Sequence, residues 1–170
     1  MKLDQKYFIP FMVIVAVFTM LFIVLTSFNF KQQQQDRFTE YTLEYDSLLT
    51  KTHPYIGKED SLRLGDLSGN QVLLVFWSSW SEKSANLLNE IESITQYDPS
   101  LKVVAALVKD VTDSAEEAII QHDFIYIDGT ILFNKIRVPG IPSYLLLDEN
   151  GNLVSTHVGY KEGAIKDLFQ

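Results

Sequence analysis

The apolar positions near the start of the chain form one uninterrupted run. Residues 7–30 carry no charged side chain and consist mainly of Ile, Val, Phe, Leu and Met. As an α-helix they span about 36 Å, enough to cross a hydrocarbon core of about 30 Å. A core helix rarely stays apolar all round for this length, and a signal-peptide apolar region usually runs about 7 to 15 residues. The pattern therefore predicts an uncleaved transmembrane anchor at 7–30 that follows a cytoplasmic tail at 1–6.

A second, polar segment follows the anchor. Residues 31–37 are polar and rich in helix formers. Beyond them, apolar side chains recur at spacings of three and four, as in an amphipathic helix, at Phe38, Tyr41, Tyr45, Leu48 and Leu49. Residues 52–54 should end this helix, because the residue before a proline is pushed out of the helical region. The segment 31–53 is thus expected to be a stalk, which either packs on the following domain or offers a docking face to a partner.

Shorter apolar runs alternate with helical patterns in residues 54–170. The expected strands are 72–77, 101–108, 143–147 and 153–158, and the expected helices are 86–94, 114–122, 131–136 and 163–169. The run 72–77 is apolar throughout, as in a central parallel strand that is covered on both faces. Residues 148–152 have the turn chemistry of an antiparallel hairpin. A βαβ half followed by a ββα half predicts a small α/β domain with a mixed central sheet.

Charge is distributed unevenly between the two parts. Residues 1–37 carry four Lys/Arg and two Asp/Glu, whereas the remainder carries ten and twenty. The acidic body argues against nucleic-acid binding. Positive charge before the span favours an N-terminus inside, with only weak opposition from Lys31 and Arg37. We expect a single-pass protein of a bacterial inner membrane whose C-terminal domain is periplasmic or otherwise extracytoplasmic.

Two motifs resemble a known family. The first is Val-Leu-Leu-Val-Phe-Trp-Ser-Ser-Trp-Ser-Glu-Lys-Ser at 72–84, and the second is Val-Pro-Gly-Ile-Pro-Ser-Tyr-Leu-Leu-Leu-Asp at 138–148. Together with residues 62–69 they resemble the membrane-anchored thioredoxins of the TlpA and ResA type, which belong to the redoxins. The resemblance covers residues 55–170. It implies a thioredoxin-like fold, a Trp-Cys-x-x-Cys site at a helix start, and a cis-proline loop at Ile141 and Pro142.

The family's reaction cannot run in this chain. By position, the nucleophilic and resolving cysteines fall on Ser81 and Ser84, and the whole sequence contains no cysteine. Disulfide exchange needs a thiolate, and a serine hydroxyl forms no redox couple. No catalytic residue is therefore predicted, and the protein is not expected to be an enzyme. The resemblance still implies a shallow polypeptide-binding groove, formed by Trp80, Ser81, Glu82, Lys83, Ser84, Ile141 and Pro142.

Other site chemistries find little support. Serine hydrolysis needs a positioned base and acid, so Ser81 is better interpreted as a helix cap. His53, His122 and His157 lack metal-ligand spacing. The run from Asp148 to Asn152 begins like a calcium loop, but Leu153 stands where that motif requires glycine. We expect no metal and no cofactor.

Two functions remain open at this point. The first is a membrane-tethered, redox-inactive thioredoxin-like module, which binds an extracytoplasmic or membrane protein or serves as an accessory subunit of a membrane complex. The second is a TlpA/ResA-type thiol-disulfide oxidoreductase of cytochrome maturation or periplasmic thiol reduction, whose cysteine pair has been lost or engineered to serine. The natural codons 81 and 84 would separate them.

Overall fold

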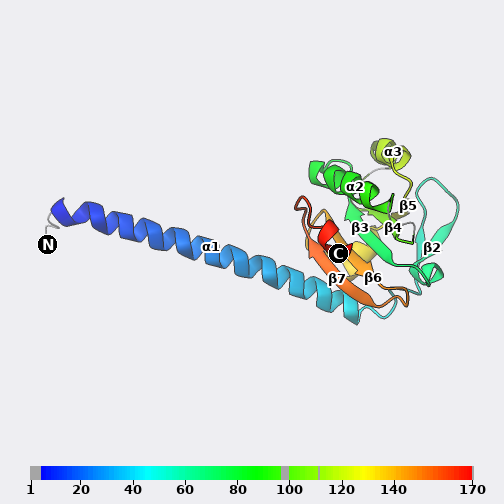
Figure 1. The fold of residues 1–170 in the computed structure, drawn as a ribbon, viewed down its shortest axis with the longest axis horizontal. Helices are drawn as coiled ribbons and strands as arrows, with labels where there is room; N and C mark the ends of the chain where they lie inside the picture. The colour runs from blue at the N-terminus through cyan, green and yellow to red at the C-terminus, as the bar shows by residue number, and fades with distance from the viewer. Residues whose placement is uncertain (1–4, 97–99, 111, 170) are drawn as a thin grey trace.

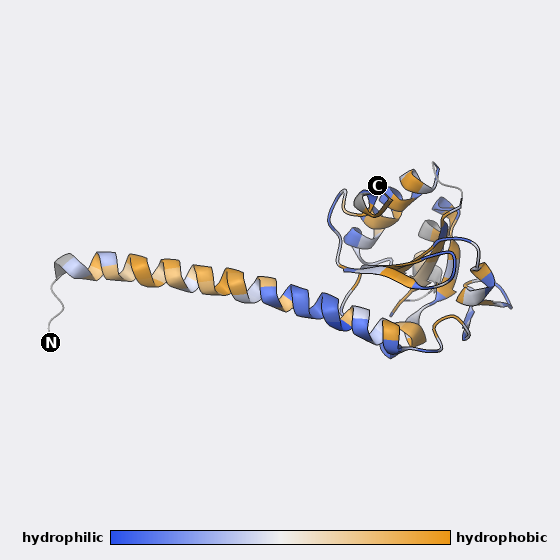
Figure 2. Cartoon of the chain, turned by 60° about the horizontal axis from the view of Figure 1, so that its bottom comes forward, coloured by the Kyte–Doolittle hydropathy of each residue, from blue (hydrophilic) through white to orange (hydrophobic). Residues whose placement is uncertain are grey.

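A single long helix leads into the folded domain. The computed structural model describes residues 5–96, 100–110 and 112–169, and helix α1 occupies Gln5–Glu44 without a break (Figure 1). Its first part is mainly apolar, as the colours of Figure 2 show, and the side chains of this part are exposed. By length and composition this helix could cross a membrane.

The predicted stalk helix ends earlier than expected. We expected helix up to residue 52, but α1 ends at Glu44, turns fill residues 46–50, and Thr52–Pro54 form strand β1. The reason is that Leu48 is buried, and Leu49 is partly buried, against the domain, whereas a helix that continued straight would place these side chains beyond it. Leu48 is 7% exposed, and the Leu49 carbonyl accepts a hydrogen bond from the Gly65 N–H at 2.9 Å.

The central sheet has the predicted mixed character. Its order is β5-β4-β3-β6-β7, where β3 (Val72–Trp77), β4 (Lys102–Leu107) and β5 (Ile125–Asp128) are parallel. Strands β6 (Ser143–Leu147) and β7 (Leu153–Val158) form the expected antiparallel hairpin, and β6 pairs antiparallel with β3. Strand β5 was not predicted, nor was the small separate sheet of β1 and β2 (Ser61–Arg63).

The helices differ from the predictions mainly near the C-terminus of the chain. Helices α2 (Glu82–Thr95), α3 (Thr112–Gln121) and α4 (Thr130–Lys135) lie close to the expected ranges. The closing helix predicted at 163–169 is wrong: only a 3₁₀ turn, η2, forms at Lys166–Phe169. Gly163 has φ +79°, which is incompatible with an α-helix, and its N–H donates to the Glu90 carboxylate at 3.0 Å. A short 3₁₀ helix, η1 (Leu64–Leu67), precedes β3.

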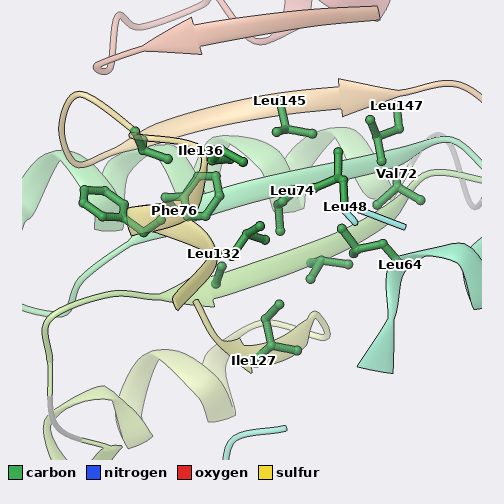
Figure 3. Close-up of a cluster of buried hydrophobic side chains, with 14 of the residues drawn as sticks. Leu48, Leu64, Val72, Leu74, Phe76, Ile127, Leu132, Ile136, Leu145 and Leu147 are labelled. Carbon is green, nitrogen blue, oxygen red and sulfur yellow. The ribbon is translucent and has the colours of Figure 1, made fainter. Parts of the chain in front are cut away.

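Two apolar clusters pack on opposite faces of the sheet. One face is covered by the end of α1, by the turn that follows it and by α4, through Phe38, Leu48 and Leu132, respectively. Figure 3 shows Leu48 and Leu132 in this cluster. The other face is covered by α2 and α3, through Leu88 and Ala115 among others. Every residue of β3 is buried because the strand is covered on both faces, which explains its continuous apolar sequence.

The end of α1 is part of this domain rather than a free stalk. Phe38 is fully buried, with its ring centroid 6.5 Å from that of Phe76 in an edge-to-face arrangement. The Gln35 amide donates to the Thr156 carbonyl and hydroxyl and accepts from the Val158 N–H at 3.0 Å. Of the two interpretations of the segment after the anchor, packing on the domain itself is therefore the one observed.

Candidate functional site

Ser81 caps the helix that follows the central strand. It has an extended backbone (φ −101°, ψ 106°), and its hydroxyl accepts a hydrogen bond from the Ser84 N–H at 3.2 Å. This is the usual N-cap arrangement, in which a side-chain oxygen satisfies one free N–H of the first turn. The capping role predicted for Ser81 is confirmed.

Ser84 is sealed inside the domain one turn later. Its side chain is fully buried, and its hydroxyl accepts from the Ser78 N–H at 3.4 Å. Ser78 is also fully buried, and its own hydroxyl donates to the Val108 carbonyl. The Ser81 hydroxyl thus bonds to the backbone of the first turn of α2, and the Ser84 hydroxyl bonds to the backbone of the loop that joins β3 to α2.

Asp110 is a contributor to this loop that the sequence analysis missed. Its carboxylate accepts a hydrogen bond from the Ser79 N–H, so it ties the end of β4 to the loop after β3. It also lines an open cleft of about 270 Å³ together with Asp128, at the ends of β4 and β5. The signal available in the sequence was that Ser79 and Asp110 each come shortly after a predicted strand, because the carboxyl ends of parallel strands lie at one edge of a sheet.

The second motif forms the expected loop before β6. The Ile141–Pro142 peptide bond is cis, as the resemblance implied. Pro142 is buried, and its carbonyl accepts from the Gly159 N–H at 2.8 Å. The Ser143 hydroxyl donates to the Gly140 carbonyl at 2.8 Å and closes the loop. Ile141 is half-buried.

Sheet register brings the two motifs to one edge. Phe76 pairs with Ser143, so Trp77 and Pro142 are the next positions along the same pair of strands. Trp80, Glu82 and Lys83 are exposed at that edge, whereas Ser84 and Pro142 are not. The seven residues predicted to form a groove therefore come from adjoining segments, but only some offer surface to a ligand. A polypeptide-binding groove stays a prediction.

The three histidines lie in separate segments of the chain. His53 is buried on β1, His157 is half-buried on β7 and stacks on Tyr144 at 5.0 Å, and His122 bonds the Glu92 carboxylate at 3.0 Å. Burial, and secondarily a nearby lysine, lowers the pKa of both His53 and His157 below 6.5. Among the described residues, no group of three or more His, Asp or Glu side chains could hold a metal ion.

Asp148 closes the β6–β7 hairpin. Its carboxylate accepts from the side chain and backbone of Asn152 and from the backbone of Asn150, at 2.8 to 2.9 Å. These hydrogen bonds, those from Asn152 first, lower the pKa of the Asp148 carboxyl. The carboxylate is thus used in local turn chemistry, which confirms the hairpin interpretation of this run.

Comparison with known proteins adds information at the level of structure. No family model matches the sequence. No curated protein matches it either.

Solved structures, in contrast, match most of the chain. A putative thiol:disulfide interchange protein DsbE from Chlorobium tepidum is 24% identical with a TM-score of 0.60, over 71% of this chain and 88% of that one. A secreted Mycobacterium tuberculosis disulfide oxidoreductase homologous to E. coli DsbE is 13% identical with a TM-score of 0.63, over 72% and 94%. StoA from Bacillus subtilis is 20% identical with a TM-score of 0.55, over 71% and 96%. With the mixed sheet, the helix-capping loop and the cis-proline loop, these likenesses establish that the chain carries a thioredoxin-like α/β fold after its long apolar helix.

Proposed function

We propose that this chain is a membrane-tethered, redox-inactive thioredoxin-like domain. In this proposal it binds an extracytoplasmic or membrane protein, as an accessory subunit of a complex at a bacterial inner membrane. The N-terminus lies inside and the domain lies on the periplasmic or extracytoplasmic side. The disulfide oxidoreductases named above share its fold, and their activity is not carried over.

One observation carries the proposal. The scaffold that presents a reactive pair in thiol-disulfide oxidoreductases is intact, but both positions hold serines whose hydroxyls bond to the adjacent backbone. Since the chain has no cysteine, no thiolate can attack a disulfide anywhere in it. A retained surface without its reaction supports binding rather than catalysis, and Trp80, which is 66% exposed, is the large apolar side chain that this surface offers to a partner.

A partner would be tested by co-purification from native membranes in mild detergent. The Trp80→Ala variant should lose a stoichiometric partner, because it removes the exposed indole. Ile120→Ala is the matched control, since Ile120 is 84% exposed on α3 and belongs to neither motif. Equal recovery of the partner with both variants would contradict a binding role for this surface.

Activity and topology are tested separately. The purified chain should reduce insulin-type disulfides only at the rate of the buffer blank, and turnover that survives removal of contaminating thioredoxins would refute redox inactivity. Protease added to intact spheroplasts should digest residues 38–170, and a fully protected domain would refute the orientation. Cysteine codons at 81 and 84 in the natural gene would favour the alternative, a TlpA/ResA-type oxidoreductase.

A further inference from the structure

The direction of β7 relative to α1 fixes which end of the domain faces the apolar helix. At one end of β7, Thr156 and Val158 bond to Gln35. At the other end, the Leu49 side chain lies beside Gly151, where an added Cβ would come within 2.7 Å of it. On α1 itself, Gln35 bonds to Val158, and Thr39, one turn later, bonds to the Thr156 hydroxyl at 2.7 Å. The strand therefore runs antiparallel to the end of α1 and to the turn that follows it, and its C-terminal end points back toward the apolar part of that helix (Figure 1).

The sheet register extends this direction to both motifs. Val158 pairs with Ser143, and Ser143 pairs with Phe76, so the start of β6 and the end of β3 lie at the same edge as the end of β7. The ends of β4 and β5 join them, because these strands are parallel to β3. We call the segments 78–84, 108–110, 128–142 and 159–163 the proximal edge.

The proximal edge lies close to the end of the apolar segment. Gln35, which bonds to the end of β7, stands five residues after Phe30, or about 7.5 Å along a helix. The headgroup layer on each side of a bilayer is about 5 to 7 Å thick. Because α1 is continuous and its Phe38 is fully buried in the domain, this spacing is set by a rigid element rather than by a flexible linker.

The surface chemistry of the proximal edge suits a phospholipid headgroup layer. Trp80 is 66% exposed and Ile131, at the start of α4, is 55% exposed. Tryptophan is enriched at membrane interfaces because its ring is apolar and its N–H is polar. The proximal edge carries five Lys/Arg and four Asp/Glu, whereas the rest of residues 38–170 carries five Lys/Arg and sixteen Asp/Glu. The strong negative charge of the domain is thus kept away from the membrane side, where it would be repelled by anionic lipid.

We propose that the proximal edge rests on the bilayer surface, with the Trp80 indole in the phospholipid headgroup layer. The inference rests on the part of the proposed function that makes α1 a membrane anchor. It also restricts the class of partner, because a polypeptide can reach Trp80 and Ile141 only along the membrane surface. The partner is then a protein embedded in the same membrane rather than one that diffuses freely.

The full chain reconstituted in vesicles of phosphatidylcholine and phosphatidylglycerol allows a direct test. The protein contains only two tryptophans, and Trp77 is 1% exposed, so the difference between the wild type and Trp80→Phe isolates the fluorescence of Trp80. A lipid with a nitroxide on its headgroup should quench most of this difference. No quenching of Trp80 in inserted protein would overturn the proposal and leave the edge free for a soluble partner.

A matched pair of labels provides the control, because the cysteine-free background allows a single fluorophore at a chosen site. Lys83→Cys places it at the proximal edge and Asn150→Cys places it in the hairpin turn before β7, both at exposed positions. A six-residue strand of about 20 Å separates the two ends, so quenching should be several-fold stronger at position 83. Equal quenching at both positions would overturn the proposal. Failure of the chain to float with the vesicles would instead refute the membrane anchor itself.

Discussion

Replacing Phe38 by alanine tests whether the end of α1 is a structural part of the domain. The Phe38 side chain is fully buried, and its ring meets that of Phe76 edge-to-face at 71°. Phe76 in turn packs on Phe133 of α4, with ring centroids 6.0 Å apart. Truncation of a buried phenylalanine removes its transfer free energy and leaves a cavity, which together cost about 3 to 5 kcal/mol. We expect a loss of that size in the free energy of unfolding for Phe38→Ala.

Leu43→Ala is the matched control, because Leu43 lies on the same helix but is 63% exposed. Urea unfolding of the full chain in detergent, followed by tryptophan fluorescence, measures both variants. With a slope of about 2 kcal/mol per molar urea, Phe38→Ala should lower the midpoint by about 2 M, whereas Leu43→Ala should leave it within about 0.3 M. Equal midpoints for the two variants would show that the helix end is not part of the core, and the fixed spacing between domain and membrane would then lose its basis.

Three further predictions concern the serines and a histidine. Ser81→Ala should cost about 1 kcal/mol of stability in urea unfolding, because it removes the cap of α2, whereas Ser93→Ala on the exposed face of α2 should cost clearly less. The double variant Ser81→Cys with Ser84→Cys places two sulfurs on one helical turn, so it should form a disulfide under mild oxidant. The pKa of the thiol at position 81 should lie below its usual value, because this residue stands at a helix N-terminus. Two free thiols of ordinary pKa would refute the placement of Ser81, Ser84 and Pro142 in one thioredoxin-like site. Burial lowers the pKa of His53, so the unfolded chain takes up this proton first as the pH falls. The wild type should therefore lose stability below about pH 6.5, and this decline should be smaller in His53→Gln; identical pH profiles would contradict the assignment.

The sequence alone determined those elements whose pattern is local. The strands at 72–77, 143–147 and 153–158 have the predicted bounds, because a continuous apolar run and a five-residue polar turn mark them without reference to neighbours. The capping role of Ser81 was likewise expected from local residues, whereas the cis peptide before Pro142 was expected only because residues 138–148 resemble the cis-proline loop of the TlpA and ResA type. The absence of thiol chemistry needed only a residue count.

Other features depended on contacts between distant segments. Strand β5 has only four residues and exists as a strand because β4 lies beside it. Helix α1 ends at Glu44 rather than near residue 52, because Leu48 is buried against a sheet whose strands all follow it in the sequence. The predicted helix at 163–169 forms turns and a 3₁₀ helix instead, and Gly163, with its positive φ and its hydrogen bond to the Glu90 carboxylate, lies outside any α-helix.

Only the tertiary structure decided which way the site at Ser81, Ser84 and Pro142 faces relative to the apolar helix. The sequence contains an apolar helix and two motifs, but nothing local relates the direction of one to the position of the others. That relation comes from the hydrogen bonds between Gln35 and β7 and from the register that links β7 to β6 and β3. Because Gln35 and Val158 lie 123 residues apart along the chain, and β3 pairs with β6 only after two intervening strands, the position of the two motifs relative to the apolar helix could be seen only once the chain was folded.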